Sequence, residues 1–435
     1  MKYYYNYLII LFFSTLAVAQ NNDFNNQGGD LLWSNPANWS LNTVPNTSNT
    51  GQVRLPLLVE SLVDTDITIS KIQSIFSTQG DVAVAGASTL TIDVGANAVQ
   101  GIENVSNQSI SLMFKGNLTI NNSTSAGISN TLMRNQNGSG NSIQFADNSV
   151  LNLLTPLEAR SGSSGNFSFN GSLAGTAPLR VNANTICTFG STSNNSGYGG
   201  DLVWVGANAS VVVNTADNNI FLPTDQKIQI NAVNGSIDVN GINVFDGNIS
   251  INGDRSFDFN LNENQDNLGT ITFAGGSADG TLNFNLGSGV TNATFGDSSA
   301  EPWNNGTLNI INYAEGVLRF GTDNSALTAA QLSQITTDSG GGPVGLDSNG
   351  FLVDRSSLSI GDEFEINKTS VYPTFTTDKL FFSKAQNSVK IFDLNGRLMK
   401  ESKELNQQDI DVSFLPAGLY MIILDGGKTE KFYKK

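Results

Sequence analysis

The sequence predicts an all-β protein with two parts, a right-handed parallel β-helix (solenoid) body followed by a small antiparallel β-sandwich. The composition is typical of short strands joined by tight turns, because 44 of the 435 residues are Gly, 10 are Pro and 14% are charged. Apolar and polar residues alternate in short segments, as in half-buried strands, and segments rich in Gly, Asn, Asp and Ser separate them. A change in net charge near residue 367 indicates the boundary between the two parts.

The predicted body spans residues 65–355 and repeats one pattern of strand and turn. In each segment the alternation would bury one side of the strand and leave the other side in water. The clearest segments are TLTIDVG (89–95), NLTINNS (117–123), VLNLL (150–154), NFSFNGS (166–172), LVWVG (202–206), SVVVN (210–214), KIQIN (227–231), SIDVNG (236–241), NISING (248–253) and TLNFNLG (281–287). No helical crossover pattern separates them.

Three architectures could accommodate these strands: an array of β-sandwiches, a β-barrel and a parallel β-helix. The turns favour the β-helix because they are rich in Asn, as in residues 104–109, 137–141 and 215–219. Asn adopts the left-handed backbone conformation that coil corners require, and stacked Asn side chains can hydrogen-bond to one another. A β-sandwich would more often contain tight two-residue hairpins, whose signals are few here.

Two segments that flank the repeats differ from them in composition. Residues 21–64 are predicted to be an N-terminal cap, and residues 303–353 would close the last coil, since a solenoid has to cover its terminal apolar coils. The positions that carry this pattern are Trp33, Asn38, Trp39, Val44 and Pro45 at the front, and Leu327, Thr328, Gln331, Leu332, Ile335 and Gly350 at the back. Both segments resemble the opening and closing segments of autotransporter-like β-helical passengers of Gram-negative bacteria.

The closing segment contains the one short helix that the sequence predicts. This helix would span residues 326–335, with Ser325 as its N-cap. Trp33, Trp39 and Trp303 are expected to pack in the core or in the caps.

The N-terminus predicts a signal peptide over residues 1–20. Residues 8–13 form a short apolar run, and Ala17 and Ala19 form a small-x-small cleavage site before Gln20. The run is much shorter than the roughly 20 residues that cross a bilayer. No later segment is long and apolar enough to cross one, so no transmembrane segment is expected in the mature chain.

Residues 370–435 contain blocks of sequence in a defined order, and residues 356–369 are predicted to be the linker before them. The order is similar to that of the type A sorting domain of the type IX secretion system. The matching positions are Tyr372 and Pro373; Asp393, Gly396 and Arg397; Leu415, Gly418 and Tyr420; and Lys434 and Lys435. Thr374 and Phe375 stand where the family usually has Asn and Pro, which would alter one turn.

The local pattern of these blocks agrees with a small antiparallel sandwich. Residues 389–394 alternate into a turn in which Asn395 and Gly396 could both adopt the positive φ of a type I′ hairpin. The resemblance implies that an outer-membrane translocon binds this domain, and that the body is then released or attached to surface lipopolysaccharide. It also implies a secreted or outer-surface location, which the predicted signal peptide supports independently.

The charge of the chain is unevenly distributed. Residues 1–367 contain 11 basic and 30 acidic residues, a net charge of −19, whereas residues 368–435 contain 11 and 8, a net charge of +3. The body is therefore expected to present an acidic surface without a basic stripe, which argues against nucleic acid or an anionic membrane as a partner.

No residue of the sequence is assigned a catalytic, cofactor-binding or metal-binding role. The chain contains no His, which excludes Ser-His-Asp and Cys-His nucleophilic systems and His-based zinc sites. The only cysteine, Cys187, lies in a predicted strand and is expected to be buried. Gly340, Gly341 and Gly342 precede no helix, so they do not indicate a phosphate-binding loop.

Carboxylate chemistry on a β-helix remains open. It would need a Lys or Arg base near clustered carboxylates on neighbouring coils. None of the body's bases lies beside paired acids in the sequence, and the acidic groups Asp254 with Asp258 and residues 362–365 are interpreted as solvated turns and linker. The bases are Arg54, Lys71, Lys115, Arg134, Arg160, Arg180, Lys227, Arg255, Arg319 and Arg355.

Three functional hypotheses follow. The first is a non-catalytic surface protein, adhesin-like or matrix-binding, which a smooth Asn, Ser and Thr face would favour. The second is a polysaccharide-degrading lyase or hydrolase, which a groove with a Lys or Arg and at least two carboxylates would favour. The third is a carbohydrate-binding module, for which an exposed Trp204 or Tyr198 in a shallow groove would be the sign.

Overall fold

The computed structural model describes residues 20–435, except residues 49, 57–59, 76–79, 96–99, 106–110, 124–130, 137–139, 163–164, 276–279, 339–342, 356–369, 404–405 and 426–428. The chain divides into two compact units, Met1–Ser357 and Leu358–Lys435, and each is described by itself. The predicted cleavage positions Ala17 and Ala19 and the predicted linker lie outside the described residues. No helix within the described residues is long and apolar enough to cross a membrane.

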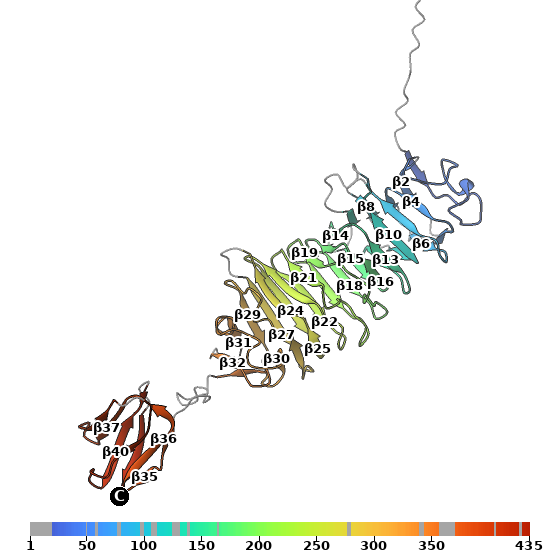
Figure 1. Cartoon of the computed structure of the whole chain (residues 1–435). Helices are drawn as coiled ribbons and strands as arrows, with labels where there is room; N and C mark the ends of the chain where they lie inside the picture. Colours follow the sequence, from blue (N-terminus) through green and yellow to red (C-terminus); the bar gives the residue numbers. More distant parts are fainter. Residues whose placement is uncertain are drawn as a thin grey trace, which may run out of the picture. The chain divides into compact units, whose positions relative to one another are not determined.

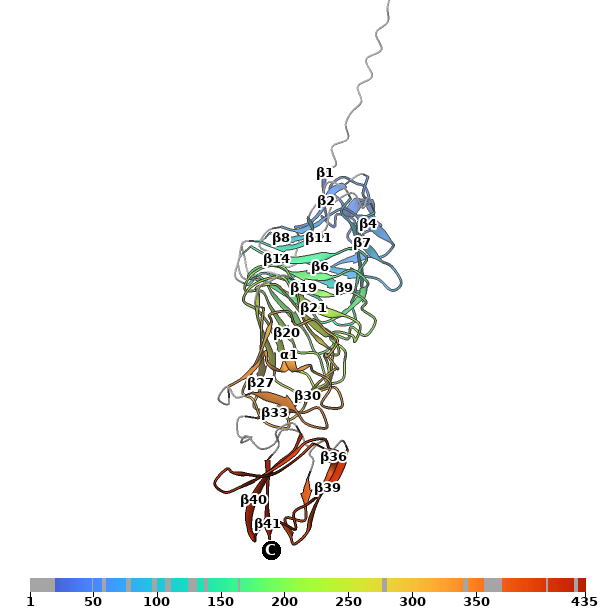
Figure 2. The same cartoon turned by 60° about the vertical axis from the view of Figure 1, so that its left-hand side comes forward.

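The first unit is a parallel β-solenoid of about ten turns (Figure 1). Its strands form an eleven-stranded sheet, a twelve-stranded sheet and a third face that consists of a five-stranded and a three-stranded sheet. Strands of successive turns lie side by side along each face, as the rotated view also shows (Figure 2). All strand pairs in these sheets are parallel, which confirms the predicted β-helix over the sandwich array and the barrel.

The three faces contain the following strands. The eleven-stranded sheet has β1 (Gln20–Asp23), β2 (Thr50–Leu55), β5 (Ile72–Ser74), β8 (Gln100–Asn104), β11 (Thr131–Asn135), β14 (Leu157–Ser161), β17 (Leu179–Val181), β19 (Leu202–Trp204), β21 (Lys227–Ile230), β23 (Asn248–Asn252) and β26 (Ile271–Ala274). The twelve-stranded sheet has β3 (Glu60–Val63), β6 (Gly80–Val84), β9 (Ser111–Lys115), β12 (Ser142–Phe145), β15 (Asn166–Phe169), β18 (Ile186–Phe189), β20 (Ser210–Val213), β22 (Gly235–Val239), β24 (Ser256–Leu261), β27 (Thr281–Leu286), β29 (Thr307–Ile311) and β31 (Ile335–Thr337). The third face has β4 (Ile67–Ile69), β7 (Leu90–Asp93), β10 (Asn117–Asn121), β13 (Val150–Leu153) and β16 (Ser172–Gly175), and later β25 (Gln265–Leu268), β28 (Ala293–Phe295) and β30 (Leu318–Phe320).

The alternating pattern of the sequence sets the inside and outside of each strand. In β10, Leu118 and Ile120 are buried and Thr119 between them is not. Each of the ten segments that showed this alternation contains a strand, so the strand predictions are confirmed.

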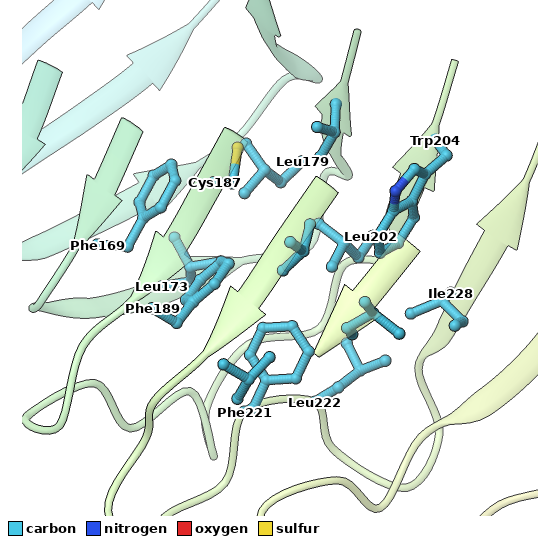
Figure 3. Close-up of a cluster of buried hydrophobic side chains, with 14 of the residues drawn as sticks. Phe169, Leu173, Leu179, Cys187, Phe189, Leu202, Trp204, Phe221, Leu222 and Ile228 are labelled. Carbon is cyan, nitrogen blue, oxygen red and sulfur yellow. The ribbon is translucent and has the colours of Figure 1, made fainter. Parts of the chain in front are cut away.

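Aromatic rings form a continuous ladder inside the solenoid. Phe114, Phe145, Phe169 and Phe189 share one register position, and their ring centroids are 5.5, 5.2 and 4.9 Å apart in stacked arrangements. The ladder continues through Phe221, Phe245, Phe259, Phe284, Phe295 and Phe320. Figure 3 shows its middle section, with Cys187 buried in the same core, as expected. Such ring pairs stabilise the core beyond the area that they bury.

Asn residues make the corners of the coils and connect the coils to one another. Nine of the ten non-Gly residues with positive φ in the described part of the body are Asn, including Asn218 (φ 62°). On the outside of the twelve-stranded sheet, Asn283 donates to Asp258 (2.7 Å) and Asn309 donates to Asn283 (3.2 Å). Both expected roles of Asn are thus seen in the described residues, including the turn at 215–219, whereas most of the turns at 104–109 and 137–141 lies outside them.

The tryptophans pack inside the body, as predicted. Trp33 and Trp39 are fully buried, and their rings meet edge to face with centroids 5.0 Å apart. Trp39 Nε1 donates to the carbonyl of Trp33 (2.9 Å), and Trp303 Nε1 donates to the carbonyl of Ile271 (2.8 Å). Trp33 and Trp39 lie in the predicted cap, residues 21–64. The strands β1, β2 and β3 of this segment already belong to the solenoid sheets.

The predicted helix is present but shorter, and the prediction of Ser325 as its N-cap is wrong. The helix α1 spans Ala329–Leu332, and Thr328 forms a capping box with Gln331. Ser325 instead donates to the carboxylate of Asp323, two residues before it. The short hairpin of β32 (Val344–Leu346) and β33 (Leu352–Asp354) follows β31 near the end of this unit.

The second unit consists of two small sheets around one apolar core. One sheet has the order β34 (Val371–Tyr372), β36 (Lys379–Gln386) and β39 (Gln407–Asp411); the other has β35 (Phe375–Thr376), β41 (Thr429–Lys434), β40 (Gly418–Ile423), β37 (Val389–Asp393) and β38 (Leu398–Ser402). The predicted antiparallel sheets are confirmed, with the addition of one short parallel pair, β35 with β41. The core includes Leu380, Ile391 and Ile422, which are fully buried.

Candidate functional site

The turn between β37 and β38 is organised by Asp393. Its Oδ1 accepts hydrogen bonds from the backbone N–H groups of Asn395 (3.0 Å) and Arg397 (2.9 Å), and Arg397 Nε lies 3.2 Å from its Oδ2. Gly396 has φ 76°, whereas Asn395 is not among the residues with positive φ. The predicted type I′ turn is therefore wrong, because that turn needs positive φ at both central residues. The carboxylate thus connects Asp393 with Arg397, and the positive φ accounts for the Gly between them.

A second group of motif residues fixes the start of β40. Tyr420 is buried against Phe432, with ring centroids 5.5 Å apart, and its hydroxyl donates to the carbonyl of Pro416 (2.8 Å). Leu415 is buried in the same core, and Gly418 begins the strand. These contacts hold the loop before β40 against the sheet.

The remaining motif residues lie on the surface or at the chain end. Tyr372 is 52% exposed and its ring stacks on Phe381, while Pro373 follows it across a cis peptide bond. Lys434 is buried and donates to the carbonyl of Lys435 (2.7 Å). Eight of the eleven exposed large apolar side chains among the described residues belong to this unit, so its surface differs from that of the body.

A polar groove of about 690 Å³ lies on the outer side of the eleven-stranded sheet, over its later strands. Ten of its thirteen lining residues have amide, hydroxyl or charged side chains, and the other three are Ile249, Ala274 and Pro302. The ten are Asp201, Asp225, Lys227, Gln229, Asn248, Ser250, Asn252, Thr270, Thr272 and Glu301. A second groove of about 580 Å³ shares Asn248 and Thr270 with it. Burial raises the pKa of Asp246, which lines this second groove.

Two of the three carboxylates of the first groove accept hydrogen bonds from donors on neighbouring coils. Asp201 accepts from the backbone N–H of Lys227 (3.1 Å) and from Gln229 Nε2 (2.8 Å). Glu301 accepts from the hydroxyl of Thr272 (2.8 Å). These bonds orient carboxylate acceptors in a groove that the Lys227 side chain also lines, although the residues are far apart in the sequence.

The same sheet carries most of the body's positive charge. Of the ten Lys and Arg in residues 21–367, six lie on it or immediately before one of its strands: Arg54, Lys71, Arg134, Arg160, Arg180 and Lys227. Several of these cations pair with acids of the same face. Arg54 pairs with Asp23, Lys71 with Glu103 and Arg160 with Glu158. The topology thus gathers on one face bases that are scattered in the sequence, together with acids that pair with several of them.

Two aromatic residues considered as sugar platforms are not available for that role. Trp204 is fully buried and donates from Nε1 to the carbonyl of Ala209 (3.2 Å), and Tyr198 is 3% exposed and donates to the carbonyl of Ala177 (2.9 Å). Both rings face the core, as Figure 3 shows for Trp204. The third hypothesis therefore loses the sign that would have favoured it.

Sequence reasoning missed the groove because its members come from several turns of the solenoid. Asp201 and Gln229 are 28 residues apart, and Thr272 and Glu301 are 29 apart. The one available signal was the alternation of each strand, which marks Gln229 and Thr272 as outward-facing but does not say which strands are neighbours. Within the described residues, no group of three or more Asp, Glu or Cys is arranged to hold a metal ion.

Comparison with known proteins identifies only the C-terminal unit. Residues 370–435 match the family model of the secretion system C-terminal sorting domain. No curated protein and no solved structure matches the chain. The chain thus ends in a sorting domain of the type IX secretion system, and the protein is secreted or carried on the cell surface.

Proposed function

We propose that the β-solenoid body is a non-catalytic, adhesin-like or matrix-type module that binds polysaccharide through the polar groove over β19, β21, β23 and β26. The observation that carries the proposal is the lining of that groove, in which hydroxyl, amide and carboxylate groups surround a volume of about 690 Å³. Sugars present many hydroxyl groups, which both donate and accept, so a site with mixed donors and acceptors suits them.

Secretion supports this role, since an exported protein meets polysaccharides of the cell surface and the surroundings. The type IX translocon would act on the C-terminal unit, and the body would then be free or attached to surface lipopolysaccharide. The autotransporter-like character of the end segments remains part of this proposal. Trp39 and Gln331 support it, because both are buried at the ends of the solenoid where a cap is needed.

The test is retention of the purified secreted protein on immobilised algal and plant polysaccharides, combined with assays for new reducing or unsaturated ends. We expect retention without cleavage. The variant Q229A should weaken retention, because it removes a groove side chain whose amide also holds Asp201. The matched control is Q144A, a half-buried Gln on β12 of the twelve-stranded sheet. Equal retention of both variants would contradict the proposed groove.

A second candidate is a polysaccharide lyase or hydrolase, and one observation favours it. Lys227 shares the groove with Asp201, Asp225 and Glu301, which meets the stated requirement of a base near two or more carboxylates. A lyase could use the Lys amine as its base. Cleavage by the wild type that is lost in K227M, with retention preserved, would establish this candidate over the first.

A further inference from the structure

The outer face of β11, β14 and β17 concentrates arginines in an otherwise acidic body. Arg134 and Arg160 are register partners on adjacent strands, and Arg180 is the register partner of Glu158. Adjacent parallel strands lie about 4.8 Å apart, so like charges at partner positions repel each other. The outward positions from β1 to this face carry five cations and three carboxylates, a local excess of positive charge. They are Asp23, Arg54, Lys71, Glu103, Arg134, Glu158, Arg160 and Arg180.

Two of the three acids of this cluster, Glu103 and Glu158, are much less exposed than the cations that pair with them. The Glu158 side chain is 6% exposed, whereas the Arg160 side chain is 47% exposed. Glu158 Oε1 accepts from both Nε (3.1 Å) and Nη2 (2.8 Å) of Arg160, and it also accepts from Asn182. These bonds fix the plane of the guanidinium. Since a guanidinium has five N–H donors, Arg160 retains donors for a second oxyanion on its solvent side.

The cluster is continuous with the groove described above. One register row runs from Glu158 through Arg180, Val203, Gln229 and Ser250 to Thr272. Gln229, Ser250 and Thr272 line the groove. Six strand spacings separate β11 from β26, which corresponds to about 29 Å along the solenoid. A ligand that contacts both ends has to be an extended polymer.

We propose that this arginine cluster binds the anionic groups, sulfate esters or carboxylates, of an extended acidic polysaccharide whose chain continues into the groove over β19 to β26. The proposal rests on the proposed function and names its ligand class. Arginine pairs with planar and tetrahedral oxyanions through parallel N–H···O bonds, which gives both attraction and orientation.

The experiment measures binding of the purified secreted protein to alginate (carboxylate), κ-carrageenan (sulfate), laminarin (neutral) and poly-L-glutamate (an acidic peptide). We expect at least one anionic polysaccharide to bind more tightly than laminarin and poly-L-glutamate, with affinity that falls as salt is raised. R160Q and R134Q should each weaken that binding roughly tenfold, which corresponds to the loss of one charge-assisted contact. The control R255Q removes one positive charge directly before β24, on the twelve-stranded sheet. It should leave polysaccharide binding unchanged.

Several outcomes would overturn the proposal. The arginine site would be refuted if laminarin and the acidic polysaccharides bound with equal affinity. It would also be refuted if R160Q and R255Q lowered the affinity equally. In both cases the proposed function would stand. Equal binding of poly-L-glutamate would refute the polysaccharide class. Absence of binding to every polysaccharide would refute both proposals. If R160Q does not fold, R160K takes its place, because Lys keeps the charge but lacks the planar guanidinium. An R160K protein with the affinity of the wild type would count against oxyanion binding by the guanidinium of Arg160.

Discussion

The rings of Phe169 and Phe189 stack in the core with their centroids 4.9 Å apart and an interplanar angle of 17°. They are register partners on β15 and β18, so the distance between the rings follows from the spacing of the coils. Each ring also has a neighbour in the next coil, Phe145 on one side and Phe221 on the other. The ladder is therefore a one-dimensional stack inside the core, in which each ring between Phe114 and Phe320 contacts one ring before it and one after it.

Removing one ring from this stack should weaken the body strongly. We expect F189A to lower the free energy of unfolding by about 3–5 kcal/mol, because the variant leaves a cavity that neighbouring coils cannot fill. The measurement is denaturant unfolding followed by tryptophan fluorescence. The control is I186A, on the same strand but at a 38% exposed position. It should lower the free energy of unfolding much less than F189A does. Similar losses in the two variants would argue against the ring ladder as a main source of stability.

The carboxylate of Asp393 should be required for the sorting domain to keep its shape. D393A removes the acceptor for the N–H groups of Asn395 and Arg397, which should cost about 1–3 kcal/mol. We expect less protein outside the cells and more in the periplasm, measured by immunoblotting of fractions from the producing bacterium. K403A, at a side chain that is 74% exposed, should be exported normally. Normal export of D393A would show that the translocon does not need this turn.

Cys187 should be chemically inert in the folded protein. Burial raises the pKa of its thiol, so the reactive thiolate is suppressed, and the side chain is fully buried. We expect no alkylation by iodoacetamide at pH 8 in buffer and complete alkylation in denaturant, measured by mass spectrometry. Rapid alkylation in buffer would contradict the packing of β18.

Asp338 should make part of the stability of the closing coil depend on pH. Backbone N–H groups of Tyr313 (3.0 Å) and Asn312 (2.6 Å) donate to its carboxylate and hold its pKa below the ordinary value. A carboxyl group whose pKa is lowered on folding stabilises the protein above its unfolded pKa of about 3.9, and this stabilisation is lost as the pH falls toward the folded value. We therefore expect the unfolding midpoint to drop less between pH 7 and pH 3 in D338N than in the wild type.

The control for this pH effect is T336A, which changes an exposed side chain without a titratable group on β31. Its unfolding midpoint should show the same pH dependence as the wild type. A D338N protein with the pH dependence of the wild type would indicate that the two N–H groups do not favour the ionised carboxylate.

The sequence alone determined the parts of the structure that depend on neighbouring residues. Alternation places Leu118 and Ile120 inside and Thr119 outside, because successive side chains of a strand point to opposite faces. Asn218 forms a corner because Asn tolerates positive φ at small cost. The sorting domain was predictable because its motif residues, such as Asp393 and Arg397, act within one turn.

Tertiary structure alone decided which side chains of different coils meet. Arg134 lies beside Arg160, and Asp201 beside Gln229, only because the intervening turns set the register between coils. The lengths of those turns vary, so no fixed period in the sequence reveals the partners. The same register turned Trp204 into the core and collected scattered bases on one sheet. Which side chains of a strand are buried follows from the local sequence. Which side chains share a surface depends on how the coils stack.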